Sequence, residues 1–182
     1  MKKLMLIFSL TLMLIPARLS AQADNDKGFW CAASISPAAA FASNGSRATF
    51  AQADIVLGYR FSEFFKIGVG VGPRYVIPVN ANTTMMFPKG QFNTIDLPVY
   101  LDLRGSLKSQ ESSKVVPYWS VDAGYGIGQG LYASPTIGIR IGQPRGSFLV
   151  GLSYIFQHYD YSKAQMENQI AHVAGLRLGY EF

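Results

Sequence analysis

Cysteine, histidine and charge are all scarce in this sequence. It has one cysteine and two histidines, and charged residues make up 15% of its 182 positions, against about 25% in an average soluble domain. A single cysteine excludes a disulfide framework and a cysteine-based zinc site. The hydrophobic content of 49% excludes a disordered chain. Glycine is abundant, with 18 residues, and aromatic residues reach 13%; this composition favours β structure and a membrane environment.

Long apolar runs are also missing. The longest, at 4–15, follows the basic residues Lys2 and Lys3 and precedes an Ala-x-Ala pattern at 21–23. This order predicts a secretory signal peptide over 1–23, cleaved after residue 21 or 23, because about a dozen apolar residues are too few for a spanning helix. Cleavage lowers the formal net charge from +5 to +2, since Lys2, Lys3 and Arg18 are removed. The mature chain, 24–182, is expected to be one domain without the basic excess that indicates nucleic acid binding.

Helical periodicity is nearly absent, and 161–169 is the stretch that could form a turn of helix. Alternation with a period of two residues recurs instead, which is typical of strands with two different faces. It is found in eight runs: 29–41, 49–61, 65–77, 93–103, 115–127, 133–141, 148–158 and 170–182.

The two faces of these runs differ sharply. One face carries no Asp, Glu, Lys or Arg, whereas the other carries nearly all of the strand charge and most of the glycine. Such alternation over eight runs is typical of a transmembrane β-barrel, whose closed ladder satisfies every backbone group in lipid. We therefore predict an all-β fold, an eight-stranded antiparallel up-and-down transmembrane β-barrel. Its predicted lumen charges are Asp54, Arg60, Lys66, Arg74, Asp96, Asp102, Asp122, Arg140 and Arg177.

Aromatic residues favour the membrane over a soluble barrel, in which the apolar face would point inward. They gather toward the two ends of the apolar faces, and two aromatic belts are typical of the two interfaces of a bilayer. One group is Tyr59, Phe61, Phe65, Phe148, Tyr180 and Phe182; the other is Phe41, Tyr75, Phe92, Tyr125 and Phe156.

The connections set the expected orientation, because outer loops are usually longer than periplasmic turns. We expect both termini in the periplasm. The segments 42–48, 78–92, 128–132 and 160–169 are then extracellular, and 62–64, 104–114 and 142–147 are periplasmic. Two connections fit this rule poorly, since 104–114 is long for a turn and 128–132 is short for an outer loop.

The lumen is expected to be closed, because eight strands enclose a space that side chains can just fill. Its charges should pair across strands, since an unpaired buried charge is costly. Hairpin geometry suggests Arg74 with Asp96 and Arg140 with Asp122. Alternating glycines such as those at 68, 70 and 72 would leave room for facing side chains. Prolines in the runs should cause bulges or local unpairing; they are Pro37, Pro73, Pro98, Pro117 and Pro135.

Two segments resemble the central strands of the small outer-membrane β-barrel family often labelled porin-family proteins. They are Thr-Ile-Asp-Leu-Pro-Val-Tyr-Leu at 94–101 and Lys-Val-Val-Pro-Tyr at 114–118, which leads into a glycine-rich strand. The closing segment 176–182 is similar to the C-terminal signal that the barrel-assembly machinery reads in that class. The resemblance implies no catalytic residues and no cofactor. The residues that match the signal are Leu176, Leu178, Tyr180 and Phe182.

Candidate chemistry outside the barrel is limited. A hairpin centred near Gln165 would place His158 opposite His172 on the lipid-facing side, either as interfacial residues or as a lipid A-modifying site. Two histidines without a third ligand are insufficient for a metal. The cluster of Met85, Met86 and Phe87 in an outer loop either contacts a partner or folds back on the rim. Cys31 is expected to face lipid as an inert apolar residue.

Three functions remain open at this point. The first is a structural or interaction scaffold in the bacterial outer membrane, in contact with its lipids and lipopolysaccharide. The second is a narrow pore or small-ligand transport barrel, and the third is a lipid A-modifying enzyme. The sequence indicates no cofactor, no specific protein partner beyond the assembly machinery, and no oligomeric state.

Overall fold

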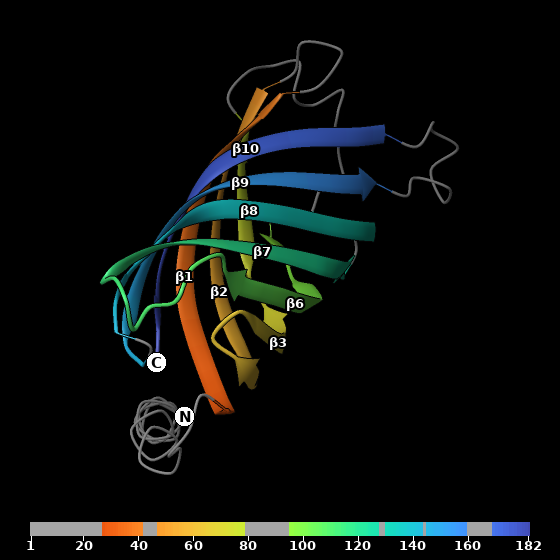
Figure 1. Ribbon diagram of the computed structural model, residues 1–182. Coiled ribbons are helices and arrows are strands. Elements are labelled where there is room, and N and C mark those ends of the chain that lie inside the picture. Colours follow the sequence, from red (N-terminus) through yellow and green to blue (C-terminus); the bar gives the residue numbers. More distant parts are fainter. Residues whose placement is uncertain (1–26, 42–46, 79–94, 128–129, 144, 160–168) are drawn as a thin grey trace, which may run out of the picture.

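A computed structural model describes residues 27–41, 47–78, 95–127, 130–143, 145–159 and 169–182. These residues form an all-antiparallel sheet (Figure 1). Among them, no helix is long and apolar enough to cross a bilayer. The strands are β1 (Gly28–Phe41), β2 (Arg47–Ser62), β3 (Phe65–Val71), β4 (Arg74–Pro78), β5 (Ile95–Asp96), β6 (Pro98–Ser106), β7 (Val115–Gly126), β8 (Gly130–Gly142), β9 (Ser147–Tyr159) and β10 (Gln169–Glu181).

The sheet closes on itself, because β1 pairs with β10 on one side and with β2 on the other. β3 and β4 are two halves of one barrel strand, since both pair with β2 in a continuous register. β5 and β6 are likewise halves of the next strand: Arg74 lies across from Asp96, and Val71 across from Val99. The ten segments therefore make eight barrel strands in up-and-down order, which confirms the predicted fold class.

Successive side chains alternate between the outside of the barrel and its lumen, as a pleated strand requires. In β3, for example, Val69 is 60% exposed and its neighbours Gly68 and Gly70 are buried. The exposed large hydrophobic side chains number more than thirty, and they come from every barrel strand. A soluble protein rarely exposes a contiguous apolar surface of this extent, so the outward face requires an apolar medium or partner.

Four of the five strand prolines coincide with interrupted pairing. β3 and β4 are separated at Pro73, and the break between β5 and β6 directly precedes Pro98. Pairing with the next strand is also interrupted at Pro37 in β1 and at Pro135 in β8. The expected unpairing is therefore found there, because a proline lacks the N–H that the ladder needs.

The fifth proline departs from this expectation, and the other four cause unpairing and not bulges. Pro117 interrupts no pairing. It lies opposite Leu107, the first residue after β6, which ends at Ser106. Leu107 donates its N–H to the Pro117 carbonyl, so the contact between the two segments continues there. Among the described residues, the register shift that the pairing shows lies between Arg60 and Ser62, away from any strand proline. The prolines thus relax the ladder without adding a residue to a strand.

The long connection between β6 and β7 folds over the end of the barrel at which β1 begins and β10 ends. It covers 107–114 and not 104–114 as predicted, because β6 continues to Ser106. Glu63, in the β2–β3 turn, accepts hydrogen bonds from the Ser109 hydroxyl at 3.0 Å and the Gln110 N–H at 3.1 Å. Gln110 is buried and donates to the Ser147 hydroxyl at the start of β9, at 2.8 Å. A connection that is long for a turn is therefore held on two sides of the opening.

Candidate functional site

The most distinctive feature of the fold is a set of charged side chains in its lumen. All nine charged residues predicted for the lumen are buried, with exposed fractions of 6% or less. They come from β2, β3, β4, β5, β6, β7, β8 and β10, so nearly the whole wall contributes. Two further charged residues, Arg104 and Glu181, are buried beside them. The set therefore contains six cations and five carboxylates, and its net charge is +1.

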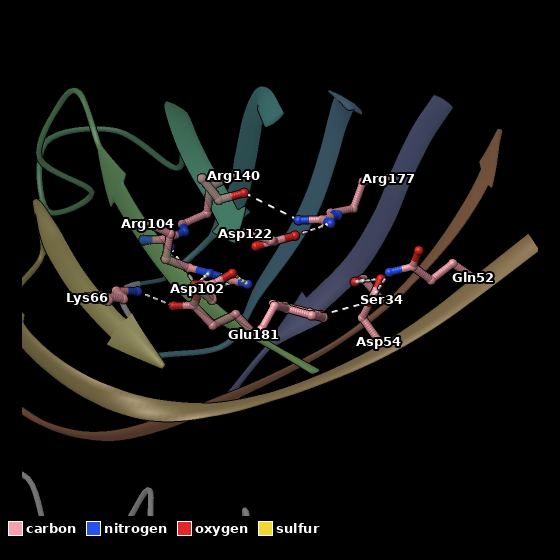
Figure 2. A network of polar contacts seen from close by, with 12 residues as sticks. Ser34, Gln52, Asp54, Lys66, Asp102, Arg104, Asp122, Arg140, Arg177 and Glu181 are labelled. Atoms are coloured by element: carbon pink, nitrogen blue, oxygen red, sulfur yellow. Dashed lines mark hydrogen bonds and ion pairs between the residues drawn. The ribbon is translucent and has the colours of Figure 1, made fainter. Parts of the chain in front are cut away.

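Glu181 is the centre of the cluster nearest the covered end (Figure 2). Its carboxylate binds Arg140 at 2.8 Å and Arg60 at 3.2 Å, and it also forms an ion pair with Lys66. A fourth cation, Arg104, lies 3.7 Å from the same carboxylate. Glu181 is 1% exposed. One carboxylate from the last residue of β10 thus joins cations from β2, β3, β6 and β8.

Glu181 and Arg104 were not among the residues predicted from the sequence, although the alternation contains the signal for both. Glu181 has the same parity as Arg177 in the run 170–182. Arg104 has the same parity as Asp102, but the predicted strand ended at 103 and Arg104 was assigned to the turn. Extending each run by parity until the backbone turns would have found both residues.

Two tight ion pairs form the next group along the lumen. Arg104 binds Asp102 through two hydrogen bonds, at 2.7 and 2.6 Å, which is the bidentate geometry that makes Arg–carboxylate pairs strong. Arg177 binds Asp122 at 2.5 Å. Asp102 and Asp122 lie directly across from each other in β6 and β7. Their two cationic partners therefore offset the repulsion between neighbouring carboxylates.

A third group surrounds Asp54 and Arg74 and has more hydrogen bonds than ion pairs. Asp54 accepts from Gln52 at 2.5 Å and from the Tyr100 hydroxyl at 2.8 Å. Arg74 donates to Gln52 at 2.8 Å and to Gln157 at 2.9 Å. The Arg74 guanidinium also stacks on the Tyr132 ring, 4.9 Å from its centre. Polar side chains from β2, β4, β6, β8 and β9 are linked in this way.

The two ion pairs predicted from hairpin geometry have different outcomes. Arg74 lies directly across from Asp96, and their charged groups are 3.9 Å apart. The prediction of Arg140 with Asp122 is wrong. Arg140 lies across from Val116, six residues along β7 from Asp122, so the two are about 20 Å apart along the strand at roughly 3.3 Å per residue. Arg140 binds Glu181 and Asp122 binds Arg177 instead.

Aromatic side chains fill the lumen between the charges, and glycines on other strands leave room for them. A Cβ atom on Gly138 would lie 2.7 Å from a ring carbon of Tyr118, and one on Gly68 would lie 3.1 Å from the Trp30 ring. Trp30 is 2% exposed and its ring lies 4.5 Å from the Arg104 guanidinium. The small residues on the inward face therefore make a packed interior.

The remaining candidate residues are placed as follows. The predicted pairing of the histidines is wrong by two residues, because the backbone pairs His158 with Ile170 and His172 with Phe156. Cys31 has the outward parity but is 9% exposed, so its neighbours cover it. Among the described residues, no cluster of three His, Cys, Asp or Glu could hold a metal. The signal peptide over 1–23 and the loop residues Met85, Met86 and Phe87 lie outside the described residues.

The C-terminal residues predicted as an assembly signal alternate with the lumen residues of β10. Leu176, Leu178 and Phe182 are exposed on the outward face, at 48%, 41% and 40%. The Tyr180 ring contacts the rings of Phe148 and Phe182. The same short segment thus presents an apolar row outward and Arg177 and Glu181 inward.

No known protein family and no curated protein matches this sequence. The structure does have solved neighbours. The Neisserial surface protein A (NspA) matches with a TM-score of 0.58 at 14% identity, over 84% of this chain and 95% of that one. This chain has the fold of a small outer-membrane β-barrel protein. Two likenesses are weaker. The outer membrane protein OprG from Pseudomonas aeruginosa matches with a TM-score of 0.45 at 12% identity, over 87% of this chain and 97% of that one. A de novo designed transmembrane β-barrel matches with a TM-score of 0.39 at 9% identity, over 83% of this chain and 95% of that one.

Proposed function

We propose that this protein is an integral scaffold of the bacterial outer membrane, with a lumen closed by its own side chains. The observation that carries the proposal is the division of side chains between the two faces of one closed sheet. Every barrel strand exposes large apolar side chains outward, and the charged ones are gathered inside. A bilayer is the medium that this arrangement fits, because a closed barrel leaves no unpaired edge in lipid.

Three observations support a closed lumen. Four cations converge on Glu181 from four strands. Aromatic side chains, including Trp30 and Tyr118, are buried against glycines of other strands. The connection 107–114 is anchored on two sides of the barrel end through Glu63 and Ser147. A solute would have to displace all three, so a scaffold role fits these contacts better than a pore.

The proposed partners follow from the two faces and the end of the chain. Outer-membrane lipids and lipopolysaccharide would contact the outward face. The barrel-assembly machinery would read the row of Leu176, Leu178, Tyr180 and Phe182. An N-terminal signal peptide would direct the chain through the inner membrane. The proposal includes no catalytic step, cofactor or nucleic acid.

The expected behaviour in cells and on gels tests membrane integration. The protein should fractionate with the outer membrane, and it should migrate faster on a gel unheated than boiled, because the hydrogen-bonded barrel resists detergent. The measurement is fractionation followed by paired gel lanes. A mature protein that stays monomeric and soluble without detergent would contradict the proposal, because its apolar face would then lie inside.

A further inference from the structure

The outward face of the barrel is hollowed between β1, β10, β9 and β8. The hollow is a shallow depression that is open to the surroundings of the barrel, and it has a volume of about 840 Å³. Its lining is almost entirely apolar and comes mainly from outward-facing side chains. They include Pro37, Ala39, Pro135, Leu152, Ala174 and Leu176.

The sequence explains why the wall is hollow at this place. The register puts Ala39 directly across from Ala174, and Ala174 across from Tyr154. Two methyl side chains therefore lie side by side where other rows carry Leu or Ile. Pro37 and Pro135 lie on either side, at the points where pairing with β10 and β9 is interrupted. Small side chains and a relaxed ladder together leave space that the protein itself does not fill.

A polar pair borders this hollow on the side of the β9–β10 connection. The Tyr154 hydroxyl, which belongs to a lining residue, lies 2.6 Å from Nδ1 of His172. Both side chains are exposed on the outward face. When the hydroxyl donates to Nδ1, the neutral imidazole carries its proton on Nε2, and Nε2–H is then a hydrogen-bond donor. In this tautomer the site combines an apolar slot with a hydrogen-bond donor at one edge.

We propose that this hollow binds one phospholipid, with an acyl chain in the slot and the phosphate accepting a hydrogen bond from His172. The inference rests on the proposed membrane location, because only there do lipids surround the outward face. An amphipathic ligand fits both halves of the site: hydrocarbon contacts Ala39 and Ala174, and a phosphate oxygen meets the donor. A purely apolar ligand would leave the donor of His172 without an acceptor.

Filling the slot tests the acyl-chain half of the proposal. Ala174→Phe places a ring in the hollow from the outward face, and Ala39→Phe does the same from β1. Ala123→Phe is the matched control, because Ala123 is exposed on the outward face of β7 and does not line the hollow. Native mass spectrometry of the detergent-purified barrel with added phosphatidylglycerol measures the fraction that retains one lipid. We expect this fraction to fall about tenfold in the two filling variants and to stay unchanged in the control.

A second arm tests the head-group contact. His172→Phe keeps an aromatic ring at the position but removes the donor. The wild-type protein should retain phosphatidylglycerol in preference to diacylglycerol with the same chains, and His172→Phe should retain the two equally. Equal retention of the two lipids by the wild-type protein would overturn the phosphate assignment. If the filling variants retained as much phosphatidylglycerol as Ala123→Phe does, the claim that the acyl chain lies in the slot would be wrong.

Failure of this inference can be told apart from failure of the proposed function. Each variant is first checked for the faster migration of the unheated protein on a gel, and only folded barrels are compared. A folded, membrane-integrated barrel that retains no lipid contradicts the phospholipid site alone. A protein that never integrates into membranes contradicts the scaffold proposal.

Discussion

Glu181→Gln is expected to lower the free energy of unfolding by about 3–5 kcal/mol, which is the usual cost of removing one partner from a buried ion pair. Glu181 is 1% exposed and lies within ion-pair distance of Arg60, Lys66, Arg104 and Arg140. The amide keeps the shape of the carboxylate but removes its charge. Four cations would then share the lumen near β10 with Asp102 as the nearest remaining carboxylate partner.

Urea unfolding of the barrel in phospholipid vesicles measures this change. Glu111→Gln is the matched control, because Glu111 is exposed in the connection between β6 and β7 and exposed charges contribute little. The control should unfold as the wild-type protein does. If the two substitutions gave the same unfolding midpoint, Glu181 would not hold the charge cluster together.

Val69→Arg is expected to cost roughly 2–4 kcal/mol, the range for a cation placed on the lipid face near the middle of a bilayer. Val69 is 60% exposed. It lies on the outward face between Phe65 and Tyr75, which mark the two aromatic ends of the same barrel strand. The guanidinium would therefore lie in hydrocarbon, without the partners that the lumen gives to Arg74 or Arg177. Unfolding in vesicles gives the difference from wild type.

The control for this substitution also has to be on the outward face. Val115→Arg is suitable, because Val115 is exposed at the first position of β7, and such a charge near an interface costs roughly 0–1 kcal/mol. Gly70→Ser, an inward change on the same strand, is unsuitable because a Cβ there would meet the Tyr100 ring. A harmless Val69→Arg would mean that the apolar face does not contact lipid.

Alternation along the strands allowed most of the fold to be predicted from sequence. The eight runs correspond to the eight barrel strands, and the inward parity of residues such as Lys66 and Asp102 holds throughout. The prediction of strands and of their inward faces succeeds because side chains in a strand alternate every two residues, a pattern that depends only on residues close in sequence. The same alternation identifies Glu181 and Arg104 as lumen residues, because each continues the inward parity of its own run.

Partners inside the lumen could not be predicted in the same way. Arg140 binds a carboxylate from β10 and not one from its own hairpin, because the register places Asp122 six residues away along β7. The stagger of a closed barrel brings together side chains from strands that are distant in sequence. Pairing in one hairpin predicted Arg74 with Asp96, which are direct neighbours, but not the convergence of cations from four strands on Glu181.

Planar-bilayer recording of the purified, folded protein tests most directly the claim that this is a membrane barrel with a closed lumen. The predicted result is a protein that inserts and remains in the bilayer without stable unitary conductance, because the Glu181 cluster, Trp30 and the connection 107–114 occupy the path. Arg74→Ala should not change that result. A stable unitary conductance in the wild-type protein, altered by Arg74→Ala, would contradict the account and show that the lumen is a pore.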